Sequence, residues 1–271
     1  MEKLPGVYPA KKKNGTVYYR SSITYKSKHI SLGSYSSADE AHQAYLTSSK
    51  LLCSEIEPLT PEDYTPCPLP FAKWVVLTNF KNNQIYIKTP IYLRSNYFQY
   101  YLSQEDVLTF DVDDLFYYST HSIMRRGNHL FVADYGMQIN IASRYGIKNF
   151  AVKDRDYRFV NGDDHDFRYG NIKIINSFHG VSQIPDTYPT QYLAKIHVNG
   201  DWILGRYSTE QVAAIAYNKA ADLLAQAGCK IQYTKNYLSD YTSARYAEIY
   251  HNLSLEARFI RMIKKLSASG D

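Results

Sequence analysis

The chain has 271 residues, 45% of them hydrophobic and 21% charged, which excludes global disorder and leads us to expect about two domains. The net charge of +5 is uneven: residues 1–50 hold eight Lys and Arg against three Asp and Glu, whereas residues 59–177 hold thirteen of each. The basic surplus of the N-terminal part suits a partner with a phosphate backbone, and a solvated lysine loop is the alternative.

Residues 1–57 are predicted to form a first module that opens with three strands. The first strand begins near Tyr8, and the basic turn after it, Lys11–Gly15, ends in Asn-Gly, a strong hairpin signal. The second strand alternates, so one of its faces carries Arg20, Ser22 and Thr24. A third strand is expected over residues 29–35.

The same module is predicted to end in a helix that runs to about Leu52. Ser37-Ala-Asp-Glu40 has the spacing of a capping box, which marks the start of that helix. Its inner stripe includes Ala41, Ala44 and Tyr45 and is expected to cover the apolar face of the sheet. The other sheet face is then uncovered, polar and basic.

The middle of the chain changes character. Residues 58–70 hold five prolines and are predicted to be a linker. Trp74–Leu77 and Gln84–Lys88 resemble strands. Asp111–Leu115 is acidic but lacks the glycine and the terminal glutamate of a calcium loop, so we interpret it as a solvated helix start.

The order of elements then repeats in residues 178–238. An alternating strand, Tyr192–Val198, meets an Asn-Gly turn and a second strand, Trp202–Tyr207. A helix capped by Ser208 or Thr209 is expected to run to about Ala227 before a glycine stops it. The tail, residues 239–271, is predicted to form two short helices that either pack on the rest or form a dimer contact.

Matching residues in the two copies carry a family resemblance. Leu32-Gly33-Ser34-Tyr35 matches Leu204-Gly205-Arg206-Tyr207, and Ala41, Ala44 and Tyr45 match Ala213, Ala216 and Tyr217. Gly6-Val7 and Gly180-Val181 precede them at equivalent places. Both copies resemble the DNA-binding domain of plant ethylene-response factors and the APETALA family, over some 50 residues each.

The resemblance implies that each three-stranded sheet lies in the DNA major groove with its helix behind it. In the first copy it implies base and phosphate contacts at Tyr8, Lys11, Lys12, Lys13, Arg20, Ser22, Thr24, His29 and Ser31. In the second copy it implies them at Ser182, Gln183, Lys195 and His197, together with Asp201 and Ile203. Asp201 and Ile203 suit phosphate poorly, so we expect the main footprint on the first copy.

The region from about Phe110 to Asn176 resembles HNH homing endonucleases, through Asn161-Gly162-Asp163, Asp166-x-Arg168 and Asn171-Ile172-Lys173. In that family a histidine activates water beside a divalent metal. The position of this histidine is Phe159 here, and the asparagine after Asp166 is Phe167. A phenyl ring neither accepts a proton nor binds a metal, so residues 71–177 are predicted to be a degenerate, non-catalytic HNH-like domain.

These features together predict an α+β protein with two sheet-plus-helix modules flanking the central domain. Its expected function is sequence-specific binding of double-stranded DNA, as a transcriptional regulator without catalysis. Two alternatives stay open. One is an HNH-type nuclease or nickase with a rearranged site, and the other is a second module that serves as a protein-interaction or dimerisation platform.

The expected cellular setting follows from what the sequence lacks. Three scattered cysteines form no CxxC pair, which fits a reducing compartment and argues against a structural zinc site. No signal-like N-terminus or long apolar run is visible. We therefore expect a cytoplasmic protein, nucleoid-associated in a bacterium, with no cofactor, metal or membrane contact and with a homodimer left open.

Overall fold

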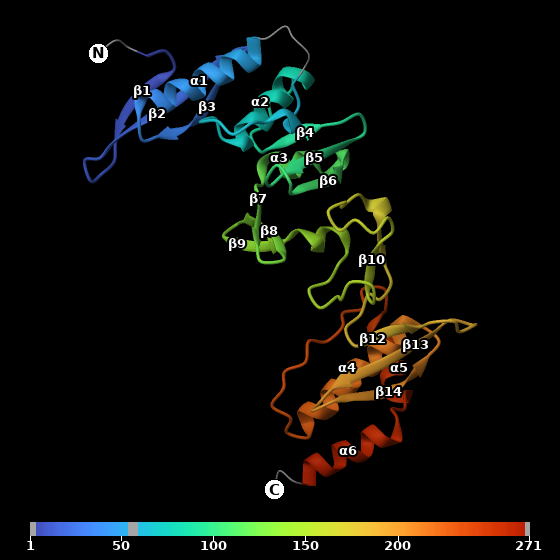
Figure 1. Cartoon of the computed structure of the whole chain (residues 1–271). Helices are drawn as coiled ribbons and strands as arrows, with labels where there is room; N and C mark the ends of the chain where they lie inside the picture. The colour runs from blue at the N-terminus through green and yellow to red at the C-terminus, as the bar shows by residue number, and fades with distance from the viewer. Residues whose placement is uncertain (1–3, 54–58, 269–271) are drawn as a thin grey trace. The chain divides into compact units, whose positions relative to one another are not determined.

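Figure 1 shows the chain as a computed structural model, in which residues 4–53 and 59–268 are described. The predicted α+β class is confirmed, because the described residues form small antiparallel sheets and six α-helices. None of the described helices is both long and apolar enough to span a membrane. The chain divides into two compact units, Met1–Ile141 with Asp163–Asn171 (unit 1) and Ala142–Gly162 with Ile172–Asp271 (unit 2). These bounds differ from the five segments predicted, and each unit is described by itself.

Unit 1 begins with the predicted three-stranded sheet. Its order is β1-β2-β3, with strands β1 (Val7–Lys11), β2 (Val17–Tyr25) and β3 (Lys28–Tyr35). Helix α1 (Ala38–Cys53) packs on the apolar face of this sheet. The predicted capping box is confirmed, because the Glu40 amide donates to Ser37 Oγ at 3.2 Å and the Glu40 carboxylate accepts from the Ser37 amide at 3.4 Å.

The strands predicted at residues 74–77 and 84–88 are wrong. The first range lies in helix α2 (Phe71–Asn83), and the second forms no regular element. Trp74, Leu77 and Phe80 pack on the core of the first sheet, whereas Val75 packs with Tyr92 from strand β4 (Ile91–Leu93) of a second sheet, here called the central sheet. A helix buried on two sides has a continuous apolar run, and such a run does not distinguish a helix from a buried strand.

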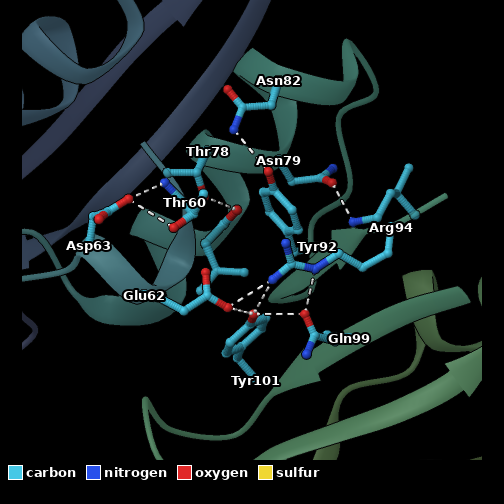
Figure 2. A network of polar contacts seen from close by, with 12 residues as sticks. Thr60, Glu62, Asp63, Thr78, Asn79, Asn82, Tyr92, Arg94, Gln99 and Tyr101 are labelled. Atoms are coloured by element: carbon cyan, nitrogen blue, oxygen red, sulfur yellow. Dashed lines mark hydrogen bonds and ion pairs between the residues drawn. The ribbon is translucent and has the colours of Figure 1, made fainter. Parts of the chain in front are cut away.

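The proline-rich segment, described from residue 59, is packed into unit 1. Its Leu69 is fully buried, and Trp74 Nε1 donates to the Thr60 carbonyl at 2.9 Å. Figure 2 shows Glu62 accepting hydrogen bonds from Arg94 at 2.8 Å and from Tyr101 at 2.7 Å, both in or beside the central sheet. The segment therefore joins the first module to the central sheet through fixed contacts.

Two more sheets and a further α-helix follow in unit 1. One sheet has the order β4-β5-β6, and the other has the order β7-β8-β9. Their bounds are β4 (Ile91–Leu93), β5 (Tyr97–Tyr101), β6 (Val107–Asp111), β7 (Ile123–Arg126), β8 (His129–Asp134) and β9 (Met137–Asn140). Helix α3 (Leu115–Thr120) follows β6, and the Phe110, Tyr118 and Phe98 rings form an aromatic core between these elements.

The acidic stretch at Asp111–Leu115 is a helix start, as predicted, but it is only partly solvated. A short 3-10 turn (Val112–Asp114) leads into α3. Asp114 is buried, and its Oδ1 accepts a hydrogen bond from Tyr169 Oη at 3.4 Å. Asp111 Oδ2 accepts from the Tyr169 amide at 2.8 Å. The acidic side chains therefore fix a distant loop, which explains the burial that the local sequence did not indicate.

Unit 2 contains a short hairpin and the second sheet-plus-helix module. The hairpin pairs β10 (Tyr157–Phe159) with β11 (Ile172–Ile174). The second sheet has the order β12-β13-β14, with strands β12 (Val181–Ile184), β13 (Gln191–His197) and β14 (Asp201–Tyr207). Helix α4 (Glu210–Gln226) covers the sheet, and Thr209 caps this helix by accepting from the Val212 amide at 3.3 Å.

The C-terminal tail forms the two predicted helices, α5 (Ser243–Asn252) and α6 (Ala257–Ala268). Leu255, Phe259 and Ile263 are buried in the core of the second module. Of the two roles left open by the sequence, packing on the rest of the chain is the one observed. Dimerisation stays a prediction.

The two modules share the same internal contacts, which explains the repeated residues. Gly6 and Gly180 have φ values of +74° and +70°, and a Cβ on either would lie within 2.5 Å of the ring of Tyr45 or Tyr217. Tyr35 Oη donates to the Leu32 carbonyl at 3.3 Å, as Tyr207 Oη does to Leu204 at 3.2 Å. The repeat thus preserves a glycine under a tyrosine ring and a tyrosine hydroxyl bound to a strand carbonyl.

Candidate nucleic-acid interface

The outer face of the first sheet brings together most of the predicted contact residues. The strand register places Tyr8 opposite Arg20 and Thr24 opposite His29. These four side chains are exposed, as is Ser31 on the edge strand. Because α1 covers the other face, this face remains uncovered among the described residues. It has the polar and basic character that the alternation predicted.

Ser22 differs from the expectation of an exposed side chain. It lies opposite Ser31 in the register, but it is only 9% exposed. The ladder is irregular between Ser21 and Ser22, and the Ser22 amide donates to the Gly6 carbonyl at 3.1 Å. The expected exposure of Ser22 is therefore corrected to a nearly buried position, and its contact with DNA stays a prediction.

The predicted basic turn is formed at one end of the first sheet. The Gly15 amide donates to the Lys12 carbonyl, and the Lys12 amide donates to the Thr16 carbonyl, both at 2.9 Å. Lys11, Lys12 and Lys13 are all exposed. Three cations thus project from a turn whose backbone is held by its own hydrogen bonds.

Arg20 is held in place by a neighbour that sequence reasoning did not single out. Tyr18 Oη accepts hydrogen bonds from Arg20 Nε at 3.2 Å and from Arg20 Nη2 at 2.8 Å. The guanidinium also lies 5.6 Å from the centroid of the Tyr18 ring. Residues two apart on a strand share a face, and this spacing was the available signal. The contacts lower the rotamer freedom that Arg20 would lose on binding a partner.

The outer face of the second sheet is less basic. Lys195 lies opposite Ile203, which is 49% exposed, and His197 lies opposite Asp201. Ser182 lies opposite Leu193 on the same face. Gln183 is exposed but pairs with Tyr192, so it points to the other side of the sheet from Ser182. The structure therefore gathers the predicted residues of this copy with the exception of Gln183.

Asp201 has cationic neighbours that reduce its effect on the face. His197 Nδ1 lies 2.9 Å from Asp201 Oδ1. The hydrogen bond with His197 holds the pKa of Asp201 below its usual range, and the charges of Lys195 and Arg155 act in the same direction. Arg155 lies outside the predicted module, in the segment before β10, so its role was missed. Arg206, opposite Leu193, is a further exposed cation on this face.

In each unit, the residues of the HNH-like pattern take part in packing and in turns. Phe159, at the place of the family's catalytic histidine, is 8% exposed in unit 2. Phe167 is buried in unit 1 and stacks on Phe110, with ring centroids 5.6 Å apart. The buried Asp166 accepts from Arg168 Nε at 2.9 Å and from Arg168 Nη2 at 2.7 Å. These residues hold the loop before β11.

One cluster of possible ligand atoms lies in the same loop of unit 1. Atoms of Asp163, Asp164 and His165 lie within 4.8 Å of one another, mostly exposed. The His165 amide donates to Asp163 Oδ1 at 2.9 Å, which is a turn contact. The His165 ring faces Asp164 at 2.9 Å and Asp106 at 3.3 Å. Asp163 and Asp164 thus make local turn contacts, and His165 also reaches Asp106 near the start of β6.

Comparison with known proteins adds no family assignment. No protein-family model, curated protein or solved structure matches the chain. Each unit therefore has its own candidate interface, defined by geometry alone: an exposed sheet face backed by a helix, of which the face in unit 1 is the more basic.

Proposed function

We propose that the chain binds double-stranded DNA sequence-specifically, as a transcriptional regulator without catalysis. The single observation that carries the proposal is the exposed outer face of the first sheet, with Arg20 at its centre and three lysines at one end. The major groove of B-DNA admits a strand ribbon, and each base pair presents a distinct donor and acceptor pattern there.

The residues of the first face divide into two kinds of contact. Lys11, Lys12 and Lys13 suit phosphates, which position a protein but carry no sequence information. Arg20 suits bidentate hydrogen bonding to a guanine, because its planar guanidinium presents two parallel donors. Thr24, His29 and Tyr8 lie on the same face and supply further polar groups for contacts with DNA.

The second face is the weaker or differently specific reader. Lys195 and Arg206 supply cations, while Ile203 offers only apolar contact, such as to a thymine methyl group. If both faces reach the same duplex, the second binding event occurs at a raised effective concentration. The target would then contain two separated short sites.

The test starts with selection of bound sequences from a random duplex pool, followed by mobility-shift titration of the selected site at several salt concentrations. Replacing Lys11, Lys12 and Lys13 by Gln should reduce the slope of log K against log salt by up to about 2.7, at about 0.9 for each phosphate contact. Lys88→Gln is the matched control, because Lys88 is exposed in unit 1 but lies outside the sheet. Absence of duplex binding at every salt concentration would refute the proposal.

Arg20 is tested by two substitutions. Arg20→Ala should lower discrimination at one base pair by about 1–3 kcal/mol. Arg20→Lys keeps the charge and should keep the salt slope, but it should lose the same discrimination because an ammonium is not a bidentate donor. Equal sequence preference for wild type and Arg20→Lys would show that Arg20 does not recognise a base.

The nuclease alternative is tested separately with supercoiled plasmid, and with the selected site, in Mg²⁺ or Mn²⁺. We expect intact DNA, because the position of the family's general base holds the buried Phe159. Cleavage that disappears in Asp163→Asn would favour the loop cluster as a rearranged metal site. The interaction-platform alternative predicts that Lys195→Gln with Arg206→Gln changes the oligomeric state and leaves DNA affinity unaltered.

A further inference from the structure

Helix α6 is docked beside the second sheet by contacts at its start and along one side. The Glu256 amide, just before α6, donates to the Leu204 carbonyl of β14 at 2.9 Å. Phe259 is fully buried, and Ile263 is buried one turn later in the same core. The apolar face of α6 is therefore already occupied by the second module.

The opposite face of α6 is strongly basic. The sequence Ala257–Ala268 contains Arg258, Arg261, Lys264 and Lys265 and no acidic residue. All four cations are exposed. Residues at i, i+3 and i+7 lie on one face of a helix, so Arg258, Arg261 and Lys265 form a stripe. This stripe points away from Phe259 and Ile263.

The stripe begins at the edge of the sheet face that is proposed to meet DNA. The Arg258 guanidinium lies 5.8 Å from the centroid of the Trp202 ring in β14, although Trp202 pairs with the buried Ile196 and so belongs to the inner face. Arg258 also lines one concave surface together with Ile203 and Arg206 of the outer face, a surface that also holds the exposed carboxylates of Asp201 and Glu256. The cations of α6 thus continue the surface of β14 in space, although they are some 50 residues away in sequence.

The dimensions and burial of α6 favour a polyanion over a lipid surface. A helix of 12 residues is about 18 Å long, and one DNA strand presents a phosphate about every 3.4 Å along the axis, so α6 spans roughly five phosphates. Amphipathic helices that lie on membranes insert their apolar face. In α6 that face is buried in the protein.

We propose that α6 contacts the phosphate backbone beside the base pairs read by β13 and β14, and so adds cations to the Lys195 and Arg206 that its sheet already carries. This inference rests on the proposed DNA binding. It assigns a positioning role to Arg258 and Arg261, which add affinity without adding sequence preference. The face that is poor in cations by sequence becomes a composite of a sheet and a helix.

The test compares three variants of the full chain with wild type. They are the single variant Arg261→Gln, the double variant Arg258→Gln with Arg261→Gln, and a matched control. Arg245→Gln is that control, because Arg245, like Arg258, is an exposed helical arginine over an aromatic ring, here 4.5 Å from the Tyr241 centroid. It lies on α5, which packs on α4, the helix that covers the opposite sheet face. We expect the salt slope to fall by about 0.9 for the single variant and about 1.8 for the double variant, with the selected sequence unchanged. The control should leave both unchanged.

The outcomes separate this inference from the proposed function. If wild type binds DNA and the lysine-loop variant lowers the salt slope, but both α6 variants match wild type, the α6 inference is overturned and the DNA-binding proposal stands. An altered sequence preference in Arg261→Gln would also overturn it, because phosphate contacts carry no sequence information. A final experiment measures binding to anionic phosphatidylglycerol vesicles. If the double variant loses vesicle binding but keeps the salt slope of DNA binding, α6 would be assigned to membranes instead.

Discussion

Replacing Gly180 by Ala should destabilise the second module more than an ordinary glycine substitution does. Gly180 has a φ of +70°, and an added Cβ would lie 2.3 Å from Tyr217 Cδ2 and 2.5 Å from the Lys195 carbonyl oxygen. Neither neighbour moves easily, since Tyr217 is buried in the core and the Lys195 carbonyl belongs to β13. At Gly6 an added Cβ would likewise lie 2.1 Å from Tyr45 Cδ2.

The magnitude follows from two contributions. An L-residue in the left-handed region is less stable by about 1–2 kcal/mol. Forcing an extra methyl group into a packed site adds about 1–3 kcal/mol. We therefore expect Gly180→Ala to lower the free energy of unfolding by about 2–5 kcal/mol. Gly228→Ala is the matched control, because Gly228 has a φ of +81° with nothing within 4 Å of an added Cβ. Its free energy of unfolding should fall only by the cost of the left-handed conformation, about 1–2 kcal/mol.

The assay uses the distribution of tryptophans. The chain has two, and only Trp202 lies in unit 2. In a Trp74→Phe background, the fluorescence change in a urea titration reports on the second sheet. Equal free energies of unfolding for Gly180→Ala and Gly228→Ala would show that the contact with Tyr217 contributes nothing, and the close approach of the Tyr217 ring would then not explain why the glycine is repeated.

Two more outcomes are expected from single side chains in unit 2. Thr209→Ala should lower stability by about 1 kcal/mol through loss of the cap on α4, whereas Ser208→Ala should not, and urea titrations of the two variants check this. Burial alone would raise the pKa of Asp156, but hydrogen bonds from Arg155, the Val152 amide and Asn176 hold it below its usual range. A carboxyl group with a lowered folded-state pKa stabilises the fold above the unfolded pKa and loses that contribution as the pH falls through the folded value. Asp156→Asn should therefore be less stable at pH 7 by about 2 kcal/mol and should lose less stability than wild type between about pH 5 and pH 2, measured by urea titrations across that range; a parallel pH dependence would contradict this.

Local signals in the sequence predicted the modules well because their causes are local. The Asn14-Gly15 turn, the capping box at Ser37 and the cap at Thr209 each depend on residues within a few positions, and each is formed. Alternation correctly placed Arg20 and Thr24 of β2 outward, and in β13 it separated the buried Ala194 and Ile196 from the more exposed Lys195 and His197. The match between Gly6 and Gly180 indicated the repeat, although not the tyrosine ring above each glycine.

The sequence predictions were wrong mainly where a segment is buried on more than one side. The run Trp74–Leu77 is apolar throughout, because one side of α2 meets the first module and another meets the central sheet. Asp114 was expected in solvent, but the loop at Tyr169 covers it from more than 50 positions away. Such contacts depend on which segments meet in space.

The sequence by itself determined the α+β class, the doubled module and the basic character of the first sheet face, since turns, caps and strand alternation are set by neighbouring residues. Only the tertiary structure decided which cations gather at the second face. Arg155 beside Asp201, Arg206 on β14 and Arg258 over Trp202 come from three separate parts of the chain. Charge acts over several ångströms of space regardless of chain distance, so their combined effect becomes visible only when these segments are folded together.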